Sequence, residues 1–193
     1  MIPLWIKLAY TIFVVIIVMV YAIKYPPCNF LWFSDIALLV TVPALWFESS
    51  LLASVMTLTV LFPEVLWNVG FFGQLATGNR MGGLADYMFD PTKPLYLRAL
   101  SLFHVFLPVL LVWMVARLGY ARDALLAATV LAWIIFPLTY WIGDPKENVN
   151  WVHGLGGELQ KRLPPLLYLG LLMAAIPLLI YLPTHFLLLG LFG

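Results

Sequence analysis

Six apolar stretches, separated by short turns or polar segments, constrain the fold of this chain more than any other feature. A helix needs about 20 apolar residues to cross the hydrocarbon core of a bilayer, and each stretch comes close to that length. Of the 193 residues, 64% are hydrophobic and 10% are charged. A soluble domain is about 45–50% apolar and about 25% charged, and a soluble fold of this size could not bury the excess. We therefore expect an all-α, polytopic membrane protein with six transmembrane helices.

The boundaries of the six spans follow from the residues that interrupt the apolar stretches. Pro26 and Pro27 end the first span, and Glu48 begins a tight turn in which Ser49 or Ser50 can cap the third. The polar segments 73–94 and 143–163 are predicted to be loops. The predicted spans are 4–23, 30–47, 51–72, 95–118, 124–142 and 164–189, and they form a single transmembrane domain over residues 1–193.

An even number of spans places both termini on the same side of the membrane. The two long loops then share the opposite side, which also holds most of the lysines and arginines. The positive-inside rule favours that side as cytoplasmic, so we expect a multi-pass protein of the cell (inner) membrane.

Composition also limits the partners and cofactors. The net charge is +1, so the chain offers no polybasic patch for nucleic acid, and membrane lipids and membrane-protein subunits are the expected partners. The single cysteine, Cys28, excludes a cysteine-rich metal site, and none of the usual paired ligand spacings is present. We therefore expect neither a metal nor another cofactor.

Three ionisable residues, Asp35, Glu64 and His104, lie inside predicted spans. A charged side chain at the centre of a membrane helix costs about 2.5–3.5 kcal/mol on insertion scales, so each needs a reason to be there. Asp35 is expected within the second span and His104 near the middle of the fourth. All three fall in the half of the membrane nearest the long loops, which predicts a polar cavity between the second, third and fourth spans.

The helical neighbours of these residues add polar groups to the same faces. Asn68 shares a face of the third span with Glu64, and Ser101 shares a face of the fourth with His104. Pro63 and Pro108 leave backbone carbonyls without helical donors close to the two ionisable residues. The candidate ligand-binding residues are Asn68 and Ser101, with Asn150, Trp151 and His153 of the second long loop as a polar lid.

These residue types support acid–base chemistry. His104 would be the general acid or base, with Asp35 and Glu64 as its charge partners. A nucleophile would have to be Ser34 or Ser101. The same side chains could instead join helices through hydrogen bonds and have no catalytic role.

Three segments carry a resemblance to known families: Asn29-Phe30-Leu31-Trp32-Phe33-Ser34-Asp35-Ile36-Ala37-Leu38, Phe103-His104-Val105-Phe106-Leu107-Pro108, and Asn148-Val149-Asn150-Trp151-Val152-His153-Gly154. With these segments the chain resembles an uncharacterised bacterial family of six-helix proteins known only as membrane-associated. More distantly, their order is similar to that in the androgen-induced membrane hydrolases, which cleave branched fatty-acid esters. That resemblance implies a six-helix layout and a functional site near Asp35 and His104.

The sequence departs from the hydrolase pattern at two points. The family's nucleophilic threonine falls on Trp32, which cannot attack an ester, and the spacing from His104 to Pro108 is one residue shorter. The resemblance therefore implies hydrolase activity only if Ser34 has taken the place of the nucleophile.

Three functions are open at this stage. The first is a lipid- or apolar-ligand-handling protein with a polar intramembrane cavity, which includes a hydrolase. The second is a non-catalytic accessory subunit of a larger membrane complex. The third is a proton-coupled carrier, although no broken-helix pair or half-to-half symmetry supports a transporter.

Overall fold

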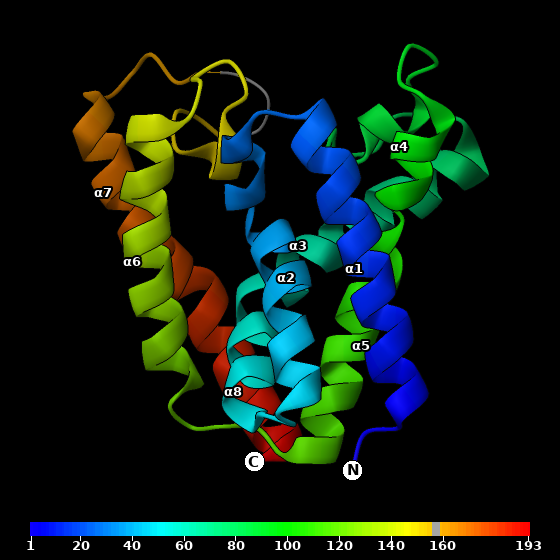
Figure 1. The fold of residues 1–193 in the computed structure, drawn as a ribbon. Coiled ribbons are helices and arrows are strands. Elements are labelled where there is room, and N and C mark those ends of the chain that lie inside the picture. The colour runs from blue at the N-terminus through cyan, green and yellow to red at the C-terminus, as the bar shows by residue number, and fades with distance from the viewer. Residues whose placement is uncertain (156–158) are drawn as a thin grey trace.

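The computed structural model describes residues 1–155 and 159–193, and the described residues form helices without a β-strand. The prediction of an all-α fold is therefore confirmed, and Figure 1 shows the helices as a bundle. The α-helices are α1 (Leu4–Lys24), α2 (Phe33–Trp46), α3 (Ser50–Thr77), α4 (Leu95–Leu100), α5 (Phe103–Leu118), α6 (Ala124–Ile142), α7 (Pro165–Ile176) and α8 (Leu182–Phe192). Shorter helical turns are η1 (Pro27–Leu31), η2 (Asp86–Phe89), η3 (Val149–Trp151) and the π-helical η4 (Pro177–Tyr181).

Five helical segments are long and apolar enough to cross a membrane: α1, α3, the pair α4 and α5, α6, and the run from α7 to α8. The sixth apolar segment, α2, has 14 residues. At a rise of about 1.5 Å per residue it extends only about 21 Å, which is less than the hydrocarbon thickness of about 30 Å.

The second helix begins later than predicted. Pro26 and Pro27 direct the chain into the 3₁₀ turn η1, so α2 starts at Phe33. Asp35 therefore lies in the first turn of α2.

The fourth span is not one continuous helix, contrary to the prediction. It breaks at Ser101 and Leu102, and His104 lies in the first turn of α5. The amides of His104 and Val105 bond to the carbonyls of Ser101 and Leu102, three residues back, at 3.2 and 2.9 Å. The change to tighter 3₁₀ bonding separates the two helices at this point.

The third helix extends further than predicted, because residues 73–77 continue α3 and do not belong to the loop. The helix ends where Gly78 adopts a left-handed conformation with φ of 73°, which glycine accepts without steric cost. At its other end, the Ser49 side chain accepts a hydrogen bond from the Leu52 amide at 3.3 Å, as the sequence predicted for a cap. α6 has the predicted bounds.

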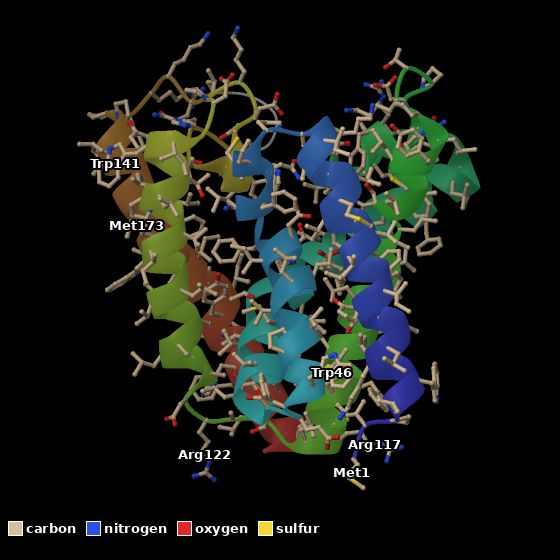
Figure 2. The ribbon with its side chains drawn as sticks, in the orientation of Figure 1. Met1, Trp46, Arg117, Arg122, Trp141 and Met173 are labelled. Carbon is tan, nitrogen blue, oxygen red and sulfur yellow. The ribbon has the colours of Figure 1, made fainter. Side chains whose placement is uncertain are left out.

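Both termini lie at one end of the bundle, and the segments 73–94, 143–155 and 159–163 lie at the other (Figure 1). Residues 156–158 of the second predicted loop are outside the described part of the chain. Arg117 and Arg122 project from the end that holds the termini, whereas Trp141 lies toward the opposite end (Figure 2).

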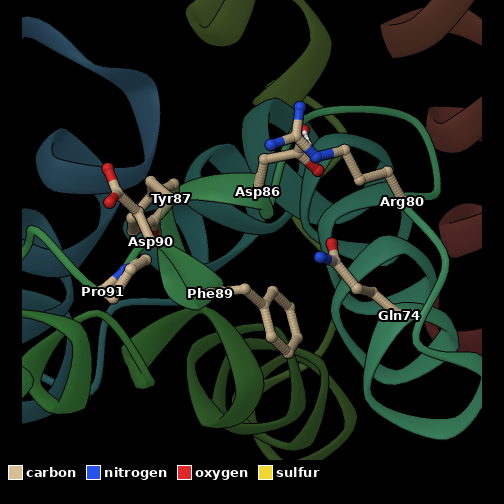
Figure 3. A pocket seen from close by; sticks show the side chains of 7 residues that line it. All are labelled: Gln74, Arg80, Asp86, Tyr87, Phe89, Asp90 and Pro91. Carbon is tan, nitrogen blue, oxygen red and sulfur yellow. Dashed lines mark ion pairs between the residues drawn. The ribbon is translucent and has the colours of Figure 1, made fainter.

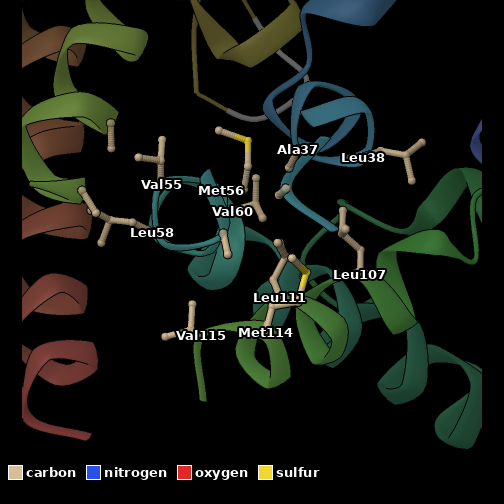
Figure 4. Packing of buried hydrophobic residues seen from close by; sticks show 14 of the residues in the cluster. Ala37, Leu38, Val55, Met56, Leu58, Val60, Leu107, Leu111, Met114 and Val115 are labelled. Atoms are coloured by element: carbon tan, nitrogen blue, oxygen red, sulfur yellow. The ribbon is translucent and has the colours of Figure 1, made fainter. Parts of the chain in front are cut away.

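The centre of the bundle is α3, which packs against α2, α5 and α6. Every residue from Ala53 to Val60 is buried, so this part of α3 is covered on all sides. Figure 4 shows the apolar packing at this level, which includes Ala37 and Leu38 of α2 and Leu107, Leu111, Met114 and Val115 of α5. The contacts of α3 with α5 bring Glu64 and His104 together.

Candidate functional site

Glu64 and His104 are in direct contact between α3 and α5. The Nδ1 atom of His104 lies 2.9 Å from Oε1 and 2.8 Å from Oε2 of Glu64. The Glu64 side chain is 3% exposed and the His104 side chain is 14% exposed. The carboxylate is thus enclosed, while part of the imidazole can be reached from outside.

Asn68 connects the backbones of the same two residues. Its Nδ2 donates hydrogen bonds to the carbonyl oxygens of Glu64 and His104, at 2.8 and 2.7 Å. The His104 carbonyl is the one that Pro108, four residues later, leaves without a helical donor. Asn68 therefore replaces the missing donor and fixes the backbone beneath the imidazole.

Aromatic rings surround His104. The ring of Trp67 stacks on the imidazole at 4.7 Å and 23°, and that of Phe103 does so at 4.1 Å and 27°. Trp67 is buried, and its Nε1 has no hydrogen-bond partner among the described residues. Sequence reasoning missed Trp67 as a site residue, although its position three residues after Glu64 puts it on the same helix face.

Asp35 lies near this pair from the start of α2. It is 5% exposed, and it is close enough to His104 and Glu64 for their charges to interact. Its Oδ1 atom is buried and has no hydrogen-bond partner in the described ranges. The positive end of the α2 dipole favours a carboxylate in this first turn.

The two candidate nucleophiles have different surroundings. Ser101 is buried, lies 3.1 Å from the hydroxyl of Tyr21, and donates to the carbonyl of Leu97 at 3.2 Å. Ser34 is half-buried in the first turn of α2. Within the described ranges neither hydroxyl hydrogen-bonds to His104, so no nucleophile–base pair is assembled there.

Tyr87 of η2 is a further residue that sequence reasoning did not single out. Its ring centroid is 6.4 Å from that of Trp67, and Glu64 is close enough for its charge to act on the Tyr87 hydroxyl. Burial raises the pKa of Tyr87 above its usual range, so this phenol stays protonated at physiological pH. A tyrosine from the first long loop therefore lies beside Trp67, the ring that stacks on His104.

The second long loop is tied to other parts of the bundle. Asn150 accepts a hydrogen bond from the Phe33 amide at 3.1 Å and donates to the Leu31 carbonyl at 2.7 Å and Thr139 at 3.4 Å. The carbonyl of Trp151 accepts a hydrogen bond from the Tyr168 hydroxyl at 2.9 Å. Through these contacts the loop holds the start of α2, beside Asp35, against α6 and α7.

His153 packs its ring against Tyr140 at a centroid distance of 4.8 Å. Burial lowers the pKa of this imidazole, and the charge of Asp144 acts in the opposite direction. The role of Asn150, Trp151 and His153 as a lid that binds a ligand stays a prediction.

The described residues also form pockets outside this cluster. One, of about 290 Å³, lies at the loop end of α3 and is lined by Gln74, Arg80, Asp86, Tyr87, Phe89, Asp90 and Pro91 (Figure 3). Another, of about 230 Å³, is an apolar hollow between α1 and α5. Neither is lined by Asp35, Glu64 or His104, whereas Tyr87 belongs to the first pocket and also lies beside Trp67.

Within residues 1–155 and 159–193, no group of three or more histidine, cysteine, aspartate or glutamate side chains could hold a metal ion. The arrangement instead suits proton transfer. A carboxylate that accepts a hydrogen bond from Nδ1–H fixes the neutral imidazole tautomer and leaves Nε2 as the basic atom.

The chain has also been compared with known proteins. Comparison with protein-family models, with curated proteins and with solved structures gives no match.

Proposed function

We propose that this chain is a multi-pass protein of the cell (inner) membrane that handles a lipid or another apolar small molecule, with Glu64 and His104 as its proton-transferring pair. The observation that carries the proposal is the contact of both Glu64 oxygens with Nδ1 of His104, at 2.9 and 2.8 Å. An enclosed carboxylate beside an imidazole that is partly accessible is the arrangement of an oriented acid–base histidine.

The outer surface supports the membrane assignment. Five helical segments have the required length and hydropathy. Large apolar side chains such as Leu126, Trp133, Ile134 and Leu179 are 70%, 53%, 58% and 74% exposed on the outside of the bundle. A lipid environment would remove this surface from water. In the proposed topology α2 crosses the membrane in addition to these five segments, which gives six spans. Both termini then share one side, and the long loops are cytoplasmic.

The proposed chemistry assigns one role to each polar group. Nε2 of His104 accepts a proton from a ligand hydroxyl or from water and returns it later, so the cycle consumes no proton. Glu64 orients the ring and stabilises its protonated form, and Asn68 fixes the backbone of both residues. If the reaction is ester hydrolysis, as the resemblance to the androgen-induced membrane hydrolases implies, Ser34 or an activated water takes the place of the missing threonine.

The test compares lipid conversion by purified full-length proteins. Wild type, His104→Gln, Glu64→Gln and His185→Gln are incubated with a total bacterial lipid extract, and the products are identified by mass spectrometry. His185 is the matched control, because it is a buried histidine that hydrogen-bonds to the side chain of Tyr120 at 2.8 Å. We expect a lipid change with wild type and His185→Gln that is lost in the two site variants. Equal lipid profiles for wild type and His104→Gln would contradict the proposal.

A specific observation favours a second candidate, the non-catalytic accessory subunit. Trp67 and Phe103 stack on His104, and its side chain is only 14% exposed. In that case Glu64 and His104 join α3 to α5, and the exposed apolar faces contact partner subunits. Purification in mild detergent at native expression decides between the two, because an accessory subunit co-elutes with its partners and a self-sufficient protein elutes alone.

A further inference from the structure

The pocket at the loop end of α3 is built from side chains of unlike chemistry. Two carboxylates, Asp86 and Asp90, and two aromatic rings, Tyr87 and Phe89, line it together with one guanidinium group, that of Arg80. In Figure 3 Arg80 and Asp86 lie together at one edge, and Phe89 projects toward the side on which Gln74 lies. With one basic and two acidic residues, the lining has a formal charge of −1.

Carboxylates and aromatic rings in one pocket are the groups that recognise an organic ammonium ion. The faces of aromatic rings attract cations, and a carboxylate neutralises the charge and accepts N–H hydrogen bonds. Asp90 is held in its ionised form, because the hydroxyl and the amide of Thr92 donate to Oδ1 at 2.6 and 2.9 Å and lower its pKa.

Asp86 has unused hydrogen-bonding capacity. Its Oδ2 atom is 3.7 Å from Nε of Arg80, which is an ion pair but is too long for a good hydrogen bond. Its Oδ1 atom is buried and receives no hydrogen bond from the described residues. Since the Asp86 side chain as a whole is 29% exposed, an ammonium group in the pocket can contact this carboxylate from its open side.

Arg80 offers the opposite charge at the edge of the same pocket. Its side chain is 82% exposed, so its guanidinium can turn from Asp86 to an anionic group. Guanidinium groups bind phosphate in a bidentate manner. The pocket therefore combines a site for an ammonium with a site for a phosphate.

The position of the pocket indicates a lipid and not a soluble compound. The segments that supply the lining residues Gln74 and Arg80 also carry exposed apolar side chains, namely Phe72, Leu75 and Met81 at 50%, 61% and 42%. A ligand whose polar head fills the pocket can therefore rest its acyl chains on these side chains.

We propose that this pocket binds the zwitterionic headgroup of an aminophospholipid, with the ammonium at Asp86, Asp90 and the rings and the phosphate at Arg80. A lipid held in this pocket would also be the substrate of the Glu64–His104 site, and this part of the inference rests on the proposed function. Tyr87 joins the two, because it lines the pocket and also lies beside Trp67 and near Glu64.

The test measures thermal stabilisation of the purified full-length protein in detergent by three probes. These are dihexanoyl-phosphatidylethanolamine, dihexanoyl-phosphatidylglycerol and the water-soluble O-phosphoethanolamine. We expect a saturable rise in Tm with the first probe, no specific rise with the second, and an affinity at least about tenfold weaker for the third, because it lacks acyl chains. Equal stabilisation by phosphatidylglycerol would show that the pocket does not recognise an ammonium group. Equal affinity for O-phosphoethanolamine would show that the ligand is a soluble compound and not a lipid.

Asp86→Asn and Phe89→Leu should each weaken the response to phosphatidylethanolamine by about tenfold. Asp144→Asn is the matched control, because Asp144 is an exposed acidic residue of the other long loop. Two independent variants guard against misfolding of one of them, and wild-type affinity in both would overturn the inference.

His104→Gln separates this inference from the proposed function. Because His104 does not line the pocket, this variant should bind phosphatidylethanolamine like wild type even though lipid conversion is lost. Binding that depends on Asp86 without any His104-dependent conversion would leave the headgroup site valid and the proposed function wrong. Lipid conversion that depends on His104 but is insensitive to Asp86→Asn and Phe89→Leu would leave the proposed function valid and the headgroup site wrong.

Discussion

The side-chain amide of Asn68 lies 2.7 Å from the backbone carbonyl oxygen of His104. This carbonyl faces Pro108, which has no N–H to donate, so the helix itself cannot satisfy it. Asn68 also bonds to the carbonyl of Glu64 at 2.8 Å, and it therefore couples the positions of Glu64 and His104. The position of the imidazole thus depends on the neutral side chain of Asn68, which bonds to the backbone of Glu64 and not to its carboxylate.

Asn68→Ala should destabilise the protein by about 1–3 kcal/mol, the cost of leaving a buried acceptor without a donor. Pro108→Ala restores an N–H at the position that faces this carbonyl. We therefore expect Asn68→Ala to cost less in the Pro108→Ala background, as measured by unfolding in mixed micelles. Additive effects of the two substitutions would show that the hydrogen bond to His104 is not the reason for the loss. Thr129→Ala is the control, because Thr129 bonds only to a carbonyl of its own helix, that of Leu125 at 2.8 Å.

Glu64→Gln and His104→Gln should each lower the free energy of unfolding by about 1.5–3 kcal/mol, the range for hydrogen bonds to charged groups. The double variant should cost less than the sum, because both single changes remove the same contact at 2.8 Å. The measurement is a double-mutant cycle on the unfolding free energy. A coupling energy near zero would mean that the contact between the two side chains contributes no stability, contrary to this prediction.

The sequence identifies Glu64, His104 and Asn68 as unusual because hydropathy is a local property, and a polar residue inside an apolar stretch is visible without the fold. It also predicts the free carbonyl before Pro108, since this follows from the proline ring. The sequence does not predict the start of α2 or the break before α5. The start of α2 depends on Asn150, which is 117 residues from Phe33 along the chain, and no local pattern encodes such a contact.

The pocket beside Tyr87 was also outside the reach of sequence reasoning. Segment 73–94 reads as a polar loop, yet it contains η2, and its residues Ala85 and Met88 pack against Trp67 in a small apolar cluster. Because this packing is tertiary, only the fold reveals that Asp86 and Phe89 face the same hollow as Gln74 of α3.

Asn150→Ala should destabilise the protein by about 1–2 kcal/mol, as expected for losing the side chain that satisfies a helix N-terminus. The Phe33 amide and the Leu31 carbonyl both lose their side-chain partner. Because Phe33 begins α2 and Leu31 ends η1, faster exchange of backbone amide hydrogens should be confined to the start of α2 and to η1. Asn79→Ala, at an exposed loop position, is the control and should leave both stability and exchange unchanged. Unaltered exchange at Phe33 in Asn150→Ala would contradict the prediction.

Acidification should destabilise the protein through Glu48, in the turn between α2 and α3. The Lys7 ammonium at 2.8 Å and the Ile2 amide at 3.0 Å donate to its carboxylate and lower the pKa of Glu48 below its ordinary value of 4.5. Because the folded-state pKa is the lower one, ionised Glu48 stabilises the fold above pH 4.5, and this contribution is lost as the pH falls through the folded-state value. Glu48→Gln should therefore lower Tm at neutral pH and make it less sensitive to acid, in thermal melts from about pH 7 to about pH 3. Glu147→Gln, at an exposed loop position, should follow the wild-type curve, and an equally steep acid loss in Glu48→Gln would assign the pH dependence to other carboxylates.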